Sequence, residues 1–86
     1  MPYISYFFGI IIRMFFGEHN PQHFHAEYQG MRAVFDFDGN VISGNIKSKT
    51  ALRLIKKWTE EHKKELVDNW KRGKKGEELI RIAPLD

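Results

Sequence analysis

The chain has 86 residues, with 14 Lys or Arg against 11 Asp or Glu and a formal net charge of +3. This length suits one small domain spanning residues 1–86, and 42% hydrophobic with 29% charged residues is ordinary globular usage that argues against a disordered chain. The absence of cysteine excludes disulfides, thiolate zinc sites and cysteine nucleophiles, and it fits a reducing compartment, so we expect a cytoplasmic protein.

Residues 3–16, YISYFFGIIIRMFF, are the most apolar stretch of the chain. A membrane helix needs about 20 apolar residues, so this stretch is too short to span a bilayer. It also lacks the basic start and small-residue cleavage site of a signal peptide, so we expect no membrane association. Because Ile, Phe and Tyr favour strands, residues 7–16 are predicted to form a strand buried on at least one face.

Three further strands are predicted along the next thirty or so residues. Residues 17–22, GEHNPQ, have the composition of a turn. In residues 23–28 and 31–37 an apolar side chain occupies every second position, as in strands with one buried face. A two-residue turn is predicted between them at Gln29-Gly30. Asp38-Gly39-Asn40 is a clearer hairpin signal, and a short fourth strand follows it at residues 41–46.

Helical signals begin at Ser48, which can cap a helix starting at Lys49. Apolar residues at helical spacing, including Trp58 and Trp70, predict a stripe that packs in the core. Residues 60–64, EEHKK, are entirely polar. They fit a bend between two helices and the solvated part of one helix equally well, so both alternatives stay open.

The helical region is predicted to end at Gly73 and Gly76, and residues 79–82 are a candidate for a short last strand. Strands are therefore grouped before helices, which is typical of an α+β fold. We expect a small antiparallel sheet of about four strands. One long or two short C-terminal helices should pack on one of its faces.

Charge divides the chain in two. Residues 1–46 contain two Lys or Arg and four Asp or Glu, whereas residues 47–86 contain twelve and seven. A basic helical half suits a surface that binds RNA or DNA, although Lys-rich helices are more often simply solvated. A small open sheet also leaves strand edges unpaired, so a strand edge or the basic helix face is expected to contact a protein partner.

The turn at Gln29-Gly30 sets the faces of the hairpin on either side of it. Six residues then form an apolar face: Phe24, Ala26, Tyr28, Met31, Ala33 and Phe35. The other face holds His23, His25, Glu27, Arg32 and Asp36. Opposite residues have Cβ atoms about 4.5–5.5 Å apart, so His23 and Asp36 come within reach of a hydrogen bond.

Three interpretations of the histidines stay open. The first is a site for zinc or another divalent transition metal formed by His19, His23 and His25, with Asp36 as a further ligand or as a partner of one. Two His two residues apart on a strand can aim both imidazoles at one ion.

The second interpretation needs no metal or other cofactor. His23 and His25 would be catalytic acid and base, with Asp36 orienting one of them. Arg13, Arg32 and His19 would bind an anionic substrate, which suits cleavage of an RNA phosphodiester.

The third interpretation is structural: His19, Asn20 and His23 close the turn with hydrogen bonds to the backbone, and His25 is merely exposed.

The sequence resembles the domain-of-unknown-function 4160 family of short bacterial proteins over nearly its whole length. The residues that carry the resemblance are Pro2-x-Ile4-Ser5, Phe8-Gly9-Ile10 through Met14-Phe15, His19 through Ala26 (HNPQHFHA), Ala51-Leu52-Arg53, Trp58 and Asn69-Trp70. The third stretch usually reads HNPPHFHA in the family, and Gln22 replaces its second proline here.

The resemblance implies a protein partner. Members of the family often lie beside a gene for a second small protein, in an arrangement similar to toxin–antitoxin pairs. The resemblance assigns no catalytic residue. It therefore leads us to expect one component of a two-protein module, which acts through the neighbouring protein and through RNA or DNA.

Overall fold

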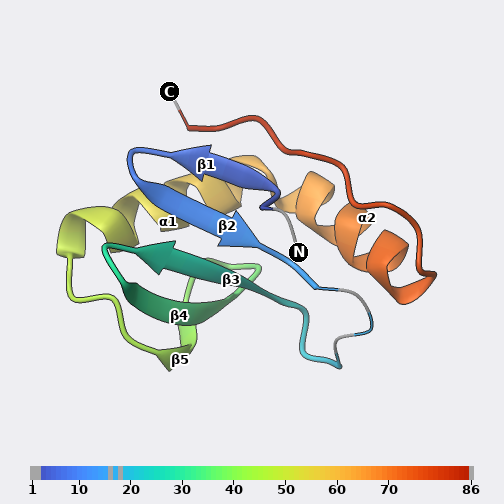
Figure 1. Ribbon diagram of the computed structural model, residues 1–86, viewed down its shortest axis with the longest axis horizontal. Coiled ribbons are helices and arrows are strands. Elements are labelled where there is room, and N and C mark those ends of the chain that lie inside the picture. Colours follow the sequence, from blue (N-terminus) through green and yellow to red (C-terminus); the bar gives the residue numbers. More distant parts are fainter. Residues whose placement is uncertain (1–2, 16, 18, 86) are drawn as a thin grey trace.

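Five strands precede two helices in the computed structural model, which describes residues 3–15, 17 and 19–85 (Figure 1). The strands pair in chain order as one antiparallel sheet, which confirms the α+β class. The elements are β1 (Ser5–Phe7), β2 (Ile10–Arg13), β3 (His23–Tyr28), β4 (Met31–Asp36), β5 (Val41–Gly44), α1 (Lys49–Glu61) and α2 (Lys63–Lys74).

The single strand predicted at residues 7–16 is wrong, because β1 and β2 form a hairpin there. Phe8 and Gly9 make its turn, with φ angles of 50° and 80°. Two successive positive φ angles are what a type I′ turn requires, and Phe rarely adopts one because of its Cβ atom. Composition therefore hides this turn. β2 ends at Arg13, and Phe16, the last residue of the predicted strand, lies outside the described residues.

The hairpin of β3 and β4 has the predicted register. Gln29 and Gly30 form its turn with φ angles of 49° and 78°, so Gln29 adopts the left-handed conformation that suits it poorly. On one face of this hairpin the Cα partners are His23 with Asp36, His25 with Val34, and Glu27 with Arg32. The turn predicted before β5 is also present, although β5 ends two residues earlier than the predicted strand.

The other face of the sheet packs against the helices and forms the core. It buries alternate residues of three strands, namely Ile10, Ile12, Phe24, Ala26, Ala33 and Phe35. Trp58 of α1 contacts Phe7 and Phe24, with ring centroids 5.5 and 5.8 Å apart. Trp70 of α2 contacts Phe37 at 6.1 Å. Both Trp side chains are buried, as predicted.

Residues 49–74 form two helices, which decides between the two alternatives that the sequence allowed. α1 begins after Ser48, whose Oγ accepts a hydrogen bond from the amide of Ala51 at 3.1 Å, as predicted. The helical path breaks at His62, which has φ −120° and separates α1 from α2. Neither helix is long and apolar enough to cross a membrane, within the part of the chain that the structure describes.

α2 ends at Lys74. Gly76, with φ 73°, lies just beyond the end, and the amide of Glu77 donates to the carbonyl of Arg72 at 2.8 Å. This is the hydrogen-bond pattern of a Schellman motif, which needs a residue with positive φ. Gly76 therefore ends the helix as predicted. Gly73 does not, because it lies buried inside the last turn of α2.

The segment after α2 is extended, but it does not form the strand predicted at residues 79–82. The buried side chain of Asn69 forms hydrogen bonds with both backbone groups of Ile80. Its Nδ2 donates to the carbonyl at 2.7 Å, and its Oδ1 accepts from the amide at 2.9 Å. The amide of Ile82 donates to the carbonyl of Ile4 at 2.8 Å. The segment therefore runs along β1 and covers that edge of the sheet (Figure 1).

Candidate functional site: the open face of the sheet

The candidate site lies on the face of the sheet away from the helices, which we call the open face. Figure 1 looks onto it, with α1 passing behind the strands. The strand register aligns one row of side chains across this face: Tyr6, Ile11, Glu27 and Arg32. It aligns a second row beside the first: Arg13, His25, Val34 and Ser43. Strand alternation thus gathers residues from all five strands on one surface.

Two arginines from different strands flank one carboxylate at the centre of the open face. Arg13 Nη1 lies 2.9 Å from Glu27 Oε1, and Arg32 Nε lies 3.5 Å from the same oxygen. The side chain of Arg32 is 80% exposed, whereas Arg13 and Glu27 are 34% and 26% exposed. The cluster carries an excess of one positive charge. Because exposed ion pairs contribute little, Arg32 can leave Glu27 to bind an external anion at small cost.

A hollow of about 620 Å³ opens on this face beside the arginines. Its lining combines apolar side chains with charged ones: Ile11, Phe15, Val34, Arg13, Glu27, Arg32 and His25, together with Ala26, Ala33, Ser43 and Gly44. The hollow is solvent-open, because it lies on a sheet surface whose side chains are half-buried or exposed. A hollow lined by both apolar and charged side chains suits a peptide segment or a nucleotide.

His23 and His25 lie together on the open face, as strand alternation predicts. Their ring centroids are 5.4 Å apart. His25 also meets the edge of Phe15 at 4.7 Å, and His23 meets Trp70 at 5.2 Å, where α2 reaches the start of β3. Both imidazoles are half-buried, so aromatic contacts hold two titratable groups at a solvent-open surface. Their catalytic roles stay predictions.

The orientation of His23 comes from the backbone. Its Nδ1 lies 2.7 Å from the carbonyl oxygen of Pro21. A carbonyl can only accept, so Nδ1 carries the hydrogen and Nε2 is the basic nitrogen of the neutral ring. A bond from His23 to the backbone of the turn was predicted by the structural interpretation of the histidines, and the structure identifies the carbonyl of Pro21 as its partner.

Asp36 has a structural role that the sequence did not reveal. Its Oδ1 accepts hydrogen bonds from the amides of Asp38 and Asn40, both at 2.9 Å, and so fixes the turn into β5. Since Nδ1 of His23 is bonded to Pro21, a carboxylate that oriented this ring could reach only Nε2. The predicted orienting role of Asp36 stays a prediction.

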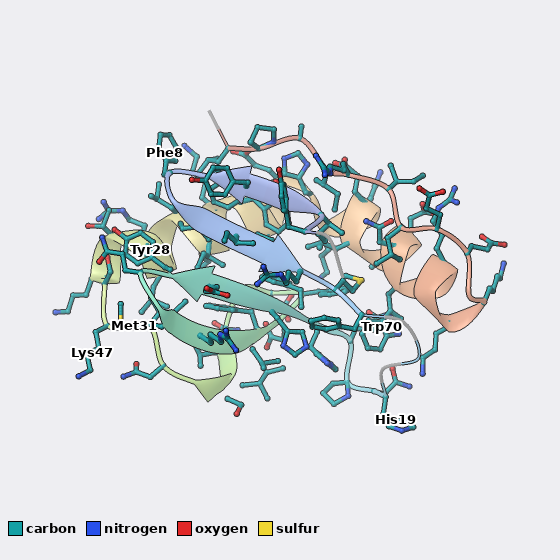
Figure 2. The ribbon with its side chains drawn as sticks, in the orientation of Figure 1. Phe8, His19, Tyr28, Met31, Lys47 and Trp70 are labelled. Atoms are coloured by element: carbon teal, nitrogen blue, oxygen red, sulfur yellow. The ribbon has the colours of Figure 1, made fainter. Side chains whose placement is uncertain are left out.

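His19 lies apart from the other two histidines. It is exposed on the loop between β2 and β3, and Figure 2 shows it at the outer end of that loop. Among the described residues, no group of three His, Cys, Asp or Glu side chains is placed to hold a metal ion. The arrangement therefore offers no support to the zinc hypothesis at His19, His23 and His25, which stays a prediction.

Tyr6, Ile11 and Phe15 belong to the open face but were not singled out from the sequence. All three lie in the apolar stretch at residues 3–16, where a single strand was predicted. The face on which each lies depends on the β1–β2 hairpin, which composition does not reveal. The same hairpin decides where Arg13 points. Arg13 was nevertheless predicted as an anion-binding residue, and the structure places it opposite His25 on the open face.

Comparison with known proteins assigns the chain to a family. A family model described as "Domain of unknown function (DUF4160)" matches residues 9–71. The chain belongs to the DUF4160 family. The matched residues run from the β1–β2 turn into α2, so they contain both histidines and both arginines of the DUF4160 open face. No curated protein and no solved structure matches the chain.

Proposed function

We propose that this DUF4160 protein is one component of a cytoplasmic two-protein module similar to toxin–antitoxin pairs. Its open face would bind the small protein that a neighbouring gene encodes. One observation carries the proposal: five strands present a surface of apolar and charged side chains around a hollow of about 620 Å³, on the face of the sheet away from the two helices. The family resemblance suggests that the partner is the product of the neighbouring gene, and the open face offers a surface that could bind it.

The residue types on the open face favour a protein partner. Aromatic residues and Arg are enriched in protein interfaces and supply most of their binding hot spots. Tyr6 is 54% exposed, and it shares one row of the sheet with Arg32. Phe15 and Arg13 line the hollow beside that row. A partner that covered this surface would bury two aromatic rings together with two guanidinium groups.

Co-expression with the neighbouring gene tests the proposal. The tagged protein should retain the neighbour's product through purification. Tyr6→Ala with Arg32→Ala should weaken that complex by roughly tenfold, because both truncations remove hot-spot residue types. Lys64→Ala with Lys71→Ala removes exposed residues of α2 and serves as the matched control. If the wild-type protein purifies alone beside a soluble neighbour, the proposal is wrong.

A second function is supported by the pair of histidines. We propose as the alternative that His23 and His25 cleave RNA without a metal. The 2′-hydroxyl would lose its proton to Nε2 of His23 and attack the phosphorus. Protonated His25 would give its proton to the departing 5′-oxygen, and the products would be a 2′,3′-cyclic phosphate and a free 5′-hydroxyl. Arg13 and Arg32 would hold the phosphate.

Cleavage of an RNA oligonucleotide tests this alternative. His23→Ala and His25→Ala should each lower the rate by about 10²–10⁴. His62→Ala, which removes an imidazole at the junction of the helices, should leave the rate unchanged. An oligonucleotide without 2′-hydroxyl groups should resist cleavage. Equal cleavage by the wild type and both open-face variants would eliminate the mechanism.

A further inference from the structure

The two edges of the sheet differ in what covers them. At one edge, the segment after α2 runs along β1 and donates the amide of Ile82 to the carbonyl of Ile4 at 2.8 Å. At the other edge, β5 has β4 on one side and ends the strand order. All four of its residues, Val41–Gly44, are exposed. The outer side of β5 therefore presents backbone donors and acceptors to an incoming chain.

β5 is short and its pairing with β4 is irregular between Val34 and Phe35, and both features limit pairing at an edge, but it lacks the chemical features that protect an edge strand. Proteins discourage pairing at such edges with charged side chains, especially Lys, or with Pro. β5 reads VISG and has neither. Val41 and Ile42 are 45% and 46% exposed, so the edge is apolar as well as unpaired. An uncharged apolar edge is the feature that strand addition by a partner uses.

Positive charge gathers at the Gly44 end of this edge, whereas the turn at its other end carries the exposed carboxylate of Asp38. Arg32 of β4 is 80% exposed on the open face. Lys47 and Lys49 follow β5 and are exposed, and neither forms an ion pair with a described residue. Figure 2 shows Lys47 on the side of the molecule where the chain leaves β5. An incoming strand with acidic side chains would complement these three cations.

The edge is continuous with the hollow of the open face. Ser43 and Gly44 belong to β5 and also line that hollow. Every second side chain of a strand added along β5 would point to the open face. A partner could therefore pair with the edge and fill the hollow with the same segment.

We infer that β5 receives an extended acidic segment of the partner protein as a sixth strand. The inference rests on the proposed two-protein module and names the part of the surface that the partner uses. Backbone pairing would supply affinity, and the cations at the Gly44 end of β5 would select a segment that is acidic where it meets them.

Calorimetric titration with the neighbour's product tests the inference. Ile42→Lys places a charge on the exposed edge, and Lys47→Glu with Lys49→Glu reverses the charge beside it. Each should raise the Kd by roughly tenfold or more. Neither should unfold the protein, because these side chains are exposed and an acidic residue suits the start of α1. In the complex, the amides of residues 41–44 should exchange more slowly with solvent.

Matched controls lie away from β5. Ile80→Lys alters an equally exposed Ile on the segment that covers β1, and Lys64→Glu with Lys71→Glu reverses two charges on α2. Both controls should leave the Kd within roughly twofold of the wild type.

Three results would overturn the role of β5 while leaving the two-protein module intact. One is wild-type affinity in both β5 variants. Another is a change in self-association of the protein alone, with unchanged affinity for the neighbour. The third is loss of RNA binding without loss of protein binding. Failure of the wild-type protein to bind the neighbour would instead remove the proposed function, and the role of β5 with it.

Discussion

The two faces of β3 have different roles, because one packs in the core and the other belongs to the candidate site. Phe24 and Ala26 point to the helices and are buried, and Phe24 contacts Trp58 at 5.8 Å. Residues 23, 25 and 27, one step away in the chain, point to the open face and are half-buried. The six residues of β3 therefore include both core residues that stabilise the fold and candidate-site residues. Substitutions on one face should change folding, and those on the other should change binding.

The largest difference should come from a pair of substitutions at neighbouring positions of β3. Phe24→Ala removes a fully buried ring and should lower the free energy of unfolding by about 3–5 kcal/mol. In a domain of this size that loss is close to the whole stability. His25→Ala should cost about 1 kcal/mol or less, because the ring is half-buried. Urea unfolding followed by Trp fluorescence measures both. Equal losses would mean that the two faces do not divide their roles.

A smaller effect should follow from opening the covered edge. Asn69→Ala removes both hydrogen bonds to the partly buried backbone groups of Ile80 and should cost about 1–3 kcal/mol. Amide exchange of Ile82 should accelerate, because the segment along β1 loses its attachment. Asp68→Ala, the exposed neighbour on α2, is the control. Unchanged exchange at Ile82 would show that Asn69 does not hold the segment.

The smallest effect should come from an ion pair that joins α2 to the turn before β5. The hydrogen bond and charge of Asp38, 2.9 Å away, raise the pKa of Lys63 above its ordinary value. A raised folded-state pKa means that the contribution is complete below the ordinary lysine pKa and is lost as pH rises through the folded value. Lys63→Met should therefore lower Tm slightly at pH 7. The difference should vanish in strong alkali, and a difference that grows with pH would contradict the assignment.

The sequence predicted the register of the β3–β4 hairpin to the residue, because a period of two and a turn ending in glycine define both register and faces. β4 ends at Asp36, one residue before the predicted end. The cap at Ser48 and the buried Trp58 and Trp70 were predicted for similarly local reasons. The turn at Phe8 could not be predicted, since Phe rarely adopts the positive φ that it has here.

Long-range contacts account for the rest. The segment after α2 has strand composition, yet the side chain of Asn69 takes the backbone groups of Ile80 that a strand would use. The candidate site shows the same limit. Alternation placed His23 and His25 together, and turn composition suggested a bond from His23 to the backbone. That the acceptor is the carbonyl of Pro21 depends on a loop path that composition does not encode.

The most direct measurement of where this protein works is an amide and imidazole NMR titration of the isotope-labelled protein with the neighbour's product. We predict perturbed signals for the open face and β5, above all at Tyr6, Arg32 and residues 41–44, with the signals of α1 and α2 nearly unchanged. Perturbations confined to the helices, with the open face silent, would contradict the assignment of the open face as the working surface.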